Sequence, residues 1–436
     1  MNFGIKQNIL VGLMLFALFL GAGNIIFPPV LGQDAGVNLP SAMIGFLITG
    51  VGLPLLAVIA IAKSGSDFEL IASRVHPLFG LIFTMVVYLS IGPFFGIPRT
   101  ATVSYEIGII PFLPDKEASG LSLALFTIVF FLITLVLALN PKRIVDTIGK
   151  ILTPILLIVI ALLAIKSVLT PMGELQEPVQ AFESQALFQG FVKGYLTIDV
   201  IAALAFGIVV VKTLEAHHVR EPKAMVKATI IAGIIAAIGL TFVYISLAYI
   251  GGTSVGQIGY LDNGGAILSN ASTILYGKYG ATILALTIIF ACITTSIGLV
   301  TACSQYFQKV YPKISYKTYA VIFTVFSTVV ANVGLSTLIK ISTPVLLFIY
   351  PLAIVLIVLS FIDEYFDRQP IVYTIPLILT GIVSIFDALA ELNITIVKVD
   401  QLFGYLPLYA QGIGWIVPAI IGTIIGIILT KLRKTR

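Results

Sequence analysis

The sequence predicts an all-α integral membrane protein with about twelve transmembrane helices. Of its 436 residues, 58% are hydrophobic and 10% are charged, and the mean hydropathy is +1.09, whereas a soluble domain has about 25% charged residues. Apolar runs of roughly 20 residues, the length that crosses the bilayer core, recur along the whole chain. They lack the alternation of barrel strands, so helices are expected to satisfy the backbone in lipid.

Charged and turn residues bound the apolar runs and thereby set the predicted spans. In chain order these cover residues 8–31, 39–62, 77–110, 121–139, 145–168, 191–211, 224–250, 279–303, 316–333, 337–360, 371–390 and 407–430. Most connections are short and no Gly/Ser linker interrupts them, which predicts a single transmembrane domain over residues 1–436. The segments 170–190 and 251–278 are longer, and they favour turns and short surface helices or, alternatively, lids.

Basic residues predict the orientation of the chain. There are 25 Lys and Arg against 20 Asp and Glu, an excess too small to indicate nucleic-acid binding. Most of the basic residues fall in one set of alternating connections, at 63–74, 142–150, 212–227, 309–317 and 431–436. Because cytoplasmic loops collect Lys and Arg, we expect a cell-membrane protein with both termini in the cytoplasm.

Two spans contain an interruption at corresponding places. The first contains Gly21 to Asn24 in its middle, and the sixth contains the run Ala202 to Gly207 (AALAFG). A unit of five spans that is repeated once must be inverted in the membrane, and interrupted helices in both halves indicate a transporter's midplane site. The predicted repeats cover about 8–168 and 191–360, and two extra helices cover about 371–430.

The stretch Gly21 to Asn24 brings polar groups into an apolar helix. Glycines cost helix stability, and a break frees backbone N–H and C=O groups to face a ligand together with the Asn24 amide. The N-terminus of a half-helix suits a carboxylate, and unwound carbonyls suit an ammonium group or a cation. The alternative is close packing of small residues between helices.

The eighth span carries hydroxyl side chains at residues 294–296, shortly after Ala291. Na⁺ is a hard cation, and hydroxyls with freed carbonyls provide the oxygens it needs without a buried charge. Alternatively, Thr294 and Thr295 donate back to a carbonyl of their own helix and bind nothing else.

Three charged residues within spans are candidates for gating or proton transfer. Arg99 and Glu106 follow an irregular stretch of prolines and glycines in the third span, about two turns apart. They either line a cavity or pair, or lie near the headgroups, where Arg snorkels. Asp199 opens the sixth span, and it is either a proton carrier or an interfacial residue or helix cap.

With these motifs the chain resembles the bacterial branched-chain amino acid:cation symporters of the BrnQ type, in the amino acid–polyamine–organocation superfamily. The resemblance rests on residues 16–29 (FALFLGAGNIIFPP), 92–106 (GPFFGIPRTATVSYE) and 204–207 (LAFG), and it covers nearly the whole chain. It implies a LeuT-like five-plus-five inverted repeat with two extra spans, and uptake of leucine, isoleucine and valine driven by Na⁺ or H⁺.

The resemblance also implies roles for individual residues. Those that would hold the substrate are Gly21, Ala22, Gly23 and Asn24, with unwound backbone at Ala202, Ala203 and Leu204, while Phe206 would line the pocket for the apolar side chain. The superfamily's sodium site corresponds to Ala17, Leu20, Ala291, Thr294 and Thr295.

Together these observations predict a secondary active symporter that imports branched-chain amino acids by alternating access, with spans one, two, six and seven moving against spans three, four, eight and nine. A cation-coupled carrier for another small neutral amino acid stays open. An intramembrane enzyme is disfavoured because no paired-carboxylate or metal-ligand motif occurs, and a channel because no filter motif repeats. The expected partners are the amino acid, Na⁺ or H⁺ as coupling ion, and the bilayer, with no other cofactor and no obligate protein partner.

Overall fold

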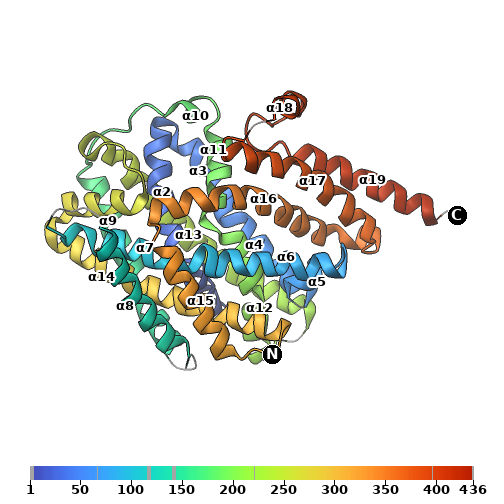
Figure 1. The fold of residues 1–436 in the computed structure, drawn as a ribbon, viewed down its shortest axis with the longest axis horizontal. Helices are drawn as coiled ribbons and strands as arrows, with labels where there is room; N and C mark the ends of the chain where they lie inside the picture. Colours follow the sequence, from blue (N-terminus) through green and yellow to red (C-terminus); the bar gives the residue numbers. More distant parts are fainter. Residues whose placement is uncertain are drawn as a thin grey trace.

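The computed structural model describes residues 4–65, 67–114, 119–139, 144–219, 221–394 and 396–434. Throughout these ranges the chain consists of helices and connecting turns, without a strand, which confirms the predicted all-α class. The helices form one bundle, from which the C-terminal pair α17 and α19 extends to the right in Figure 1. Four basic residues used in the orientation argument lie outside the described residues: Lys142, Arg143, Arg220 and Arg436.

Every predicted span contains helix. The helices are α1 (Ile5–Phe19), α2 (Ala22–Ala35), α3 (Leu39–Leu47), α4 (Leu53–Ser64), α5 (Phe68–Ala72), α6 (Pro77–Leu89), α7 (Gly96–Gly108), α8 (Gly120–Ala138), α9 (Ile144–Leu169), α10 (Gln180–Glu183), α11 (Ala186–Lys193), α12 (Asp199–Ala216), α13 (Pro222–Ile258), α14 (Gly264–Val310), α15 (Tyr316–Ala331), α16 (Leu335–Ile362), α17 (Pro370–Glu391), α18 (Val397–Phe403) and α19 (Ile416–Lys434). Short π-helical turns at 48–52 and 90–94 join α3 to α4 and α6 towards α7.

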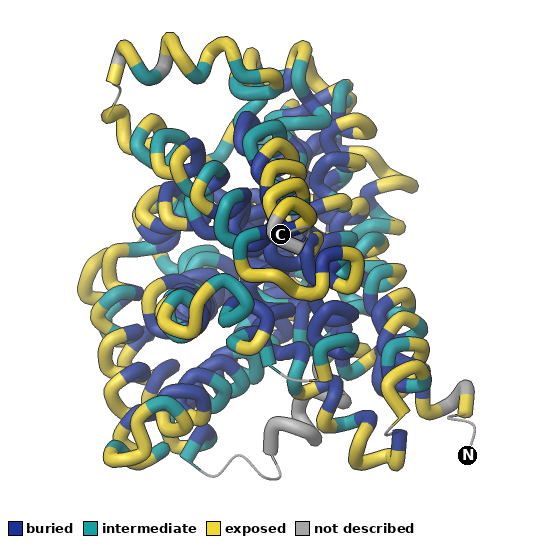
Figure 2. The backbone as a smooth tube through the Cα atoms, turned by 90° about the vertical axis from the view of Figure 1, so that its right-hand side faces the viewer, coloured by how far each residue is buried: buried dark blue, intermediate teal, exposed yellow. Residues whose placement is uncertain are grey.

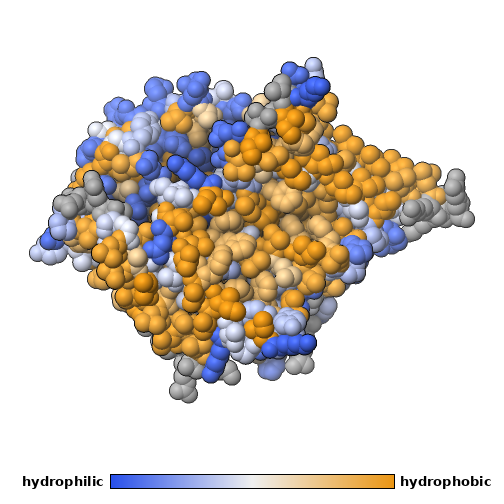
Figure 3. Space-filling view, viewed as in Figure 1, coloured by the Kyte–Doolittle hydropathy of each residue, from blue (hydrophilic) through white to orange (hydrophobic). Residues whose placement is uncertain are grey.

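The outer surface of the bundle is apolar. Within the described residues, seven helical stretches are long and apolar enough to cross a membrane, and the bent pair Ala186–Thr197 and Asp199–Ala216 would add an eighth. α8 shows why: it buries Phe130 and Phe131 but exposes Leu121, Leu125 and Ile128 on the other side. Buried residues lie towards the middle of the bundle (Figure 2), and the face in Figure 3 is mostly hydrophobic. The number of crossings stays a prediction.

The first predicted interruption is present. α1 ends at Phe19, α2 begins at Ala22, and the backbone is extended at Gly21, with φ −113° and ψ −172°. The Gly21 N–H donates to Oδ1 of Asn24 at 3.0 Å, rather than to the carbonyl four residues earlier as in a continuous helix. The glycines therefore break this span.

The second interruption lies upstream of its predicted place. A 3₁₀ turn over residues 194–197 follows α11, and the break falls at Ile198, whose φ is +67°. Ala202, Ala203 and Leu204 lie within the regular helix α12, so the prediction of unwound backbone at these three residues is wrong. Gly207 allows close packing, because a Cβ there would lie 2.8 Å from the Ile61 side chain of α4.

The predicted loop over residues 251–278 is mostly helical. α13 continues to Ile258, and α14 starts at Gly264 and bends at Gly277, where φ is +64° and ψ is −160°. Gly251 lies within α13 and allows its close approach to α2, since a Cβ there would meet the carbonyl oxygen of Pro29 at 2.1 Å. Small residues here serve the close crossing of helices and not a turn.

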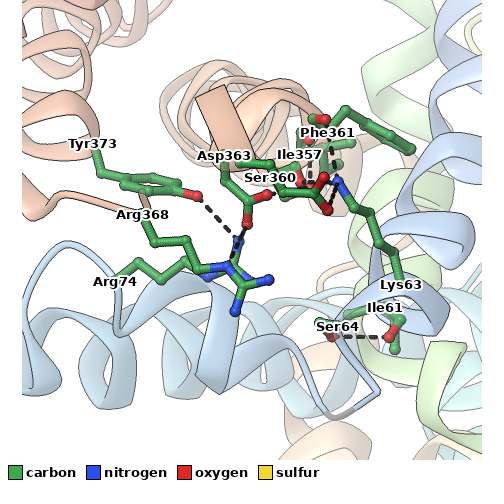
Figure 4. Close-up of polar contacts among 11 residues, drawn as sticks. Ile61, Lys63, Ser64, Arg74, Ile357, Ser360, Phe361, Asp363, Arg368 and Tyr373 are labelled. Carbon is green, nitrogen blue, oxygen red and sulfur yellow. Dashed lines mark hydrogen bonds and ion pairs between the residues drawn. The ribbon is translucent and has the colours of Figure 1, made fainter. Parts of the chain in front are cut away.

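A charge cluster joins segments at one end of the bundle. The Asp363 carboxylate, 1% exposed, lies 2.5 Å from Nη1 of Arg74, 3.3 Å from Nε of Arg368 and 3.5 Å from Nζ of Lys63 (Figure 4). Arg74 also donates to the Tyr373 hydroxyl at 3.0 Å. The cluster ties the end of α4 and the turn after α5 to the junction of α16 and α17. We call it the Asp363 cluster.

Candidate functional site

The two helix breaks meet at a small cavity of about 50 Å³. A Cβ on Gly23 would lie only 2.8 Å from the Thr197 carbonyl oxygen, so the break in the first span is in contact with the break in the sixth. The cavity is lined by Leu18, Phe19, Gly21, Ala22, Gly23, Asn24, Ile91, Gly96, Arg99, Thr100, Thr197, Ile198, Asp199, Ala202, Phe206, Thr295 and Leu299. Its lining combines apolar side chains with polar and charged ones, and its volume is smaller than the about 300–1,000 Å³ of typical ligand pockets.

A hydrogen-bond network holds the two broken helices together beside this cavity. Nδ2 of Asn24 donates to both carboxylate oxygens of Asp199, at 2.9 and 2.8 Å, and also contacts the Tyr244 hydroxyl. Tyr244 on α13 donates to Oδ2 of Asp199 at 2.5 Å. All three side chains are almost fully buried. Asp199 is thus not an interfacial residue: it connects spans one, six and seven.

Arg99 supplies a positive charge to the same cavity. Its side chain is 1% exposed, which excludes snorkelling towards headgroups. Nη1 donates to the Leu196 carbonyl oxygen at 2.7 Å, Nη2 donates to Oγ of Ser342 at 3.1 Å, and the guanidinium lies 5.1 Å from the centre of the Phe27 ring. The irregular stretch over residues 90–95 ends one residue before α7, which carries Arg99. Arg99 therefore joins α7 to the sixth and tenth spans.

The hydroxyls of the eighth span reach the break in the first span. Thr295 lines the cavity, and its Cγ2 lies 3.5 Å from where a Cβ of Gly21 would be. In this structure Thr294 and Thr295 both donate to the Ala291 carbonyl, at 2.7 and 3.0 Å. Ala17 lies in the last turn of α1, and the Gly21 N–H that would bond its carbonyl in a continuous helix is directed to Asn24. Leu20 lies at the break itself.

Glu106 lines a different and larger hollow. This hollow of about 880 Å³ lies where α7 ends and α14 begins, and Asp262, Asn263, Lys278 and Ser336 contribute to its wall. Nδ2 of Asn263 donates to the Glu106 carboxylate at 3.1 Å. Because α6 and α7 run from the Asp363 cluster towards this hollow, the hollow opens at the opposite end of the bundle. Glu106 thus lies outside the cavity at the helix breaks.

The structure brings together most but not all of the predicted site residues. The cavity is lined by Gly21, Ala22, Gly23, Asn24, Arg99, Asp199, Ala202, Phe206 and Thr295. Ala203 and Leu204 are buried within α12 and do not line it. Sequence reasoning missed Tyr244 and Thr197. Tyr244 could have been found, because a tyrosine within a long apolar helix has a hydroxyl that needs a polar partner when it is buried.

Comparisons with known proteins show the family of this chain. Residues 5–433 match the family described as "Branched-chain amino acid transport protein". The chain belongs to this family. One relative, the branched-chain amino acid permease BraB of Bacillus subtilis (strain 168), is 51% identical and aligns over 98% of this chain and 96% of its own length. As a member of a transporter family, the protein is a membrane transport protein and not an enzyme.

Solved transporter structures show the same fold as this branched-chain amino acid transport family member. Mhp1, a nucleobase-cation-symport-1 family transporter, matches with a TM-score of 0.66 at 15% identity, over 98% of this chain and 92% of its own. MhsT in complex with L-phenylalanine matches with a TM-score of 0.61 at 18% identity, over 97% of this chain and 98% of its own. The LeuT-like fold class is therefore confirmed.

Proposed function

We propose that the protein imports leucine, isoleucine and valine across the cell membrane as a symporter, coupled to Na⁺ or H⁺ and working by alternating access. Both termini lie in the cytoplasm in this proposal, so the Asp363 cluster faces the cytoplasm and the hollow beside Glu106 faces outside. Spans one, two, six and seven form one moving unit and spans three, four, eight and nine the other. The lipid bilayer is the only other partner that the proposal requires.

The observation that carries the proposal is the meeting of two helix breaks at one cavity. Broken helices offer backbone N–H and C=O groups to the amino and carboxylate groups of a substrate. Phe206, Ile91 and Leu299 provide apolar wall for a branched aliphatic side chain. Because one methylene in such a pocket is worth only about 1–3 kcal/mol, the three amino acids should compete with modest selectivity.

The proposal is tested with purified protein in liposomes. Labelled leucine is offered under an inward Na⁺ gradient and, separately, under an inward H⁺ gradient, with isoleucine, valine, alanine and serine as competitors. Accumulation under either gradient, with isoleucine and valine as the strong competitors, is the expected result. Stronger competition by alanine or serine would favour a carrier for another small neutral amino acid. Absence of accumulation and of exchange of labelled for unlabelled leucine would contradict the carrier itself.

The sodium site is proposed at Ala17, Leu20, Ala291, Thr294 and Thr295. Replacing Thr294 and Thr295 together by Ala removes two hydroxyl ligands, so we expect the Na⁺ concentration for half-maximal leucine uptake to rise by about tenfold or more. The matched control is Thr287→Ala, because Thr287 makes the same hydrogen bond to its own helix, to Ile283 at 2.7 Å, about two turns away. An unchanged Na⁺ dependence in the double variant would remove this ion site.

Asp199 is the proposed proton carrier for the alternative in which H⁺ drives uptake. An amide cannot release a proton, so we expect Asp199→Asn to abolish leucine accumulation driven by an H⁺ gradient while exchange of leucine across the membrane continues. Tyr244→Phe is the control, because it removes a hydrogen bond to Asp199 but keeps the carboxyl group. Proton-driven accumulation that persists in Asp199→Asn would exclude this role.

A further inference from the structure

Arg99 is a buried charge whose present partners are all neutral. Its guanidinium contacts a backbone carbonyl, a serine hydroxyl and an aromatic ring, and Nε has no hydrogen-bond partner. Over the part of the chain that the structure describes, no carboxylate oxygen lies within 4.0 Å of its nitrogens. An enclosed cation in a membrane span is costly unless an anion is near. Arg99 is therefore poised to receive a negative group.

The carboxylate of Asp199, which lines the same cavity as Arg99, already has hydrogen-bond partners. Both carboxylate oxygens of Asp199 accept hydrogen bonds from Asn24, and one also accepts from Tyr244. Asp199 balances the charge of Arg99 at longer range without contacting it. The free donor capacity of Arg99 is thus left for a group that comes from outside the protein.

A second source of positive potential lies next to Arg99. The first N–H groups of α2 have no partner within their helix, and the helix dipole places its positive end there. Gly23 belongs to this first turn, and a Cβ on it would lie 3.4 Å from Nη1 of Arg99. The guanidinium therefore lies beside the first turn of α2, and a cation next to a helix N-terminus is an arrangement that suits a carboxylate.

We propose that Arg99 binds the α-carboxylate of the substrate together with the N-terminal amides of α2, and so makes a carboxylate obligatory for transport. This inference rests on the proposed function, because that function places an amino acid in the cavity. A site that leaves a buried polar group unpaired rejects an analogue that lacks the matching group far more strongly than a pocket rejects a missing methylene. The wild-type protein should therefore discriminate more strongly by the carboxylate than by the branching of the side chain.

The test compares leucine with leucinamide, which keeps the side chain and the ammonium group but has no carboxylate. Both compete with labelled leucine for uptake into liposomes containing the purified protein. In the wild type we expect leucine to compete at least about a hundredfold better than leucinamide. In Arg99→Gln we expect leucine affinity to fall and this preference to drop below about tenfold. Equal competition in the wild type would overturn the proposal without any variant.

A structural role for Arg99 predicts a different pattern. If Arg99 only holds α7 against the Leu196 carbonyl, Arg99→Gln lowers transport but leaves the ratio of leucine to leucinamide unchanged, which would overturn the proposal. Should Arg99→Gln not fold, Arg99→Lys is the second variant, because it keeps the positive charge but loses the planar guanidinium that binds a carboxylate through two hydrogen bonds. The preference for leucine over leucinamide should then fall by about tenfold relative to the wild type. A wild-type protein that transports no leucine would overturn the proposed function, and this inference with it, whereas leucine transport with equal competition by leucinamide overturns the carboxylate assignment alone.

Discussion

Gly23→Ala is expected to reduce leucine uptake by about a hundredfold, because a displacement of about 1 Å at a binding site can cost that much. The added Cβ would lie 2.8 Å from the carbonyl oxygen and 3.3 Å from the Cα of Thr197, both of which belong to the backbone and cannot rotate away. It would also press on Nη1 of Arg99 at 3.4 Å. The methyl group must therefore push the two broken helices apart at the point where the proposed substrate groups bind.

Gly298→Ala is the matched control for this substitution. Gly298 also lies in a membrane helix, one residue before the cavity residue Leu299, but a Cβ there meets no atom within 4 Å. Alanine favours the helix at such a position by up to about 1 kcal/mol, so uptake should stay near the wild-type rate. Initial rates of labelled leucine uptake, normalised to the amount of reconstituted protein, give the comparison. Similar rates for Gly23→Ala and Gly298→Ala would show that the close contact between the breaks is not needed for transport.

The fold was largely predictable because it depends on the distribution of apolar residues. Bilayer thickness sets the length of the spans, and the apolar runs indicate where helices occur. The break in the first span was also predictable, since Gly21 and Gly23 are followed directly by the polar Asn24 within an apolar run. The order of elements along the chain thus follows from properties that each segment has by itself.

The second break was not predictable from local sequence. It occurs at Ile198, a β-branched residue with φ +67°, where the left-handed conformation is strained and rare. Only the surroundings can impose it: Arg99 binds the carbonyl of Leu196, and the N–H of Asp199 donates to Oγ1 of Thr197 at 3.3 Å. The sequence predicted the break within the run that ends at Gly207, but this glycine instead allows the close packing of α12 against Ile61. A glycine in a membrane helix therefore signals either a break or a crossing, and tertiary contacts decide which.

Asp363→Asn is the second substitution for which we expect a large effect, here on the free energy of unfolding. Asp363 is 1% exposed and Arg74 is 13% exposed, so their pair is mostly shielded from water. Removing one member of a buried pair leaves the other charge uncompensated and costs about 3–5 kcal/mol. Here Asp363→Asn leaves Lys63, Arg74 and Arg368 facing one another around a neutral amide. We expect about 3 kcal/mol of destabilisation, near the lower limit, because Arg368 is 60% exposed and water partly screens it.

Glu364→Gln provides the internal comparison for Asp363→Asn. Glu364 belongs to the same turn and pairs with Lys63 at 3.5 Å, but it is 71% exposed, and exposed ion pairs contribute about 0–1 kcal/mol. Thermal unfolding in detergent can be followed with a thiol-reactive fluorophore, since Cys292 and Cys303 are buried in the folded protein. Asp363→Asn should lower the melting temperature clearly, and Glu364→Gln should leave it within error of the wild type.

A double-substitution cycle separates the pair from the rest of the cluster. Because Arg74 is the partner closest to Asp363, Asp363→Asn combined with Arg74→Gln should cost much less than the sum of the two single changes. Strict additivity of the two unfolding free energies would mean that Asp363 and Arg74 contribute independently and not as one coupled pair.

The coupled cluster ties α4 of the proposed moving unit to the α16–α17 junction, so this end of the bundle can open only when the Asp363 contacts break. Asp363→Asn should then also raise the rate of leucine exchange from the proposed cytoplasmic side relative to the wild type.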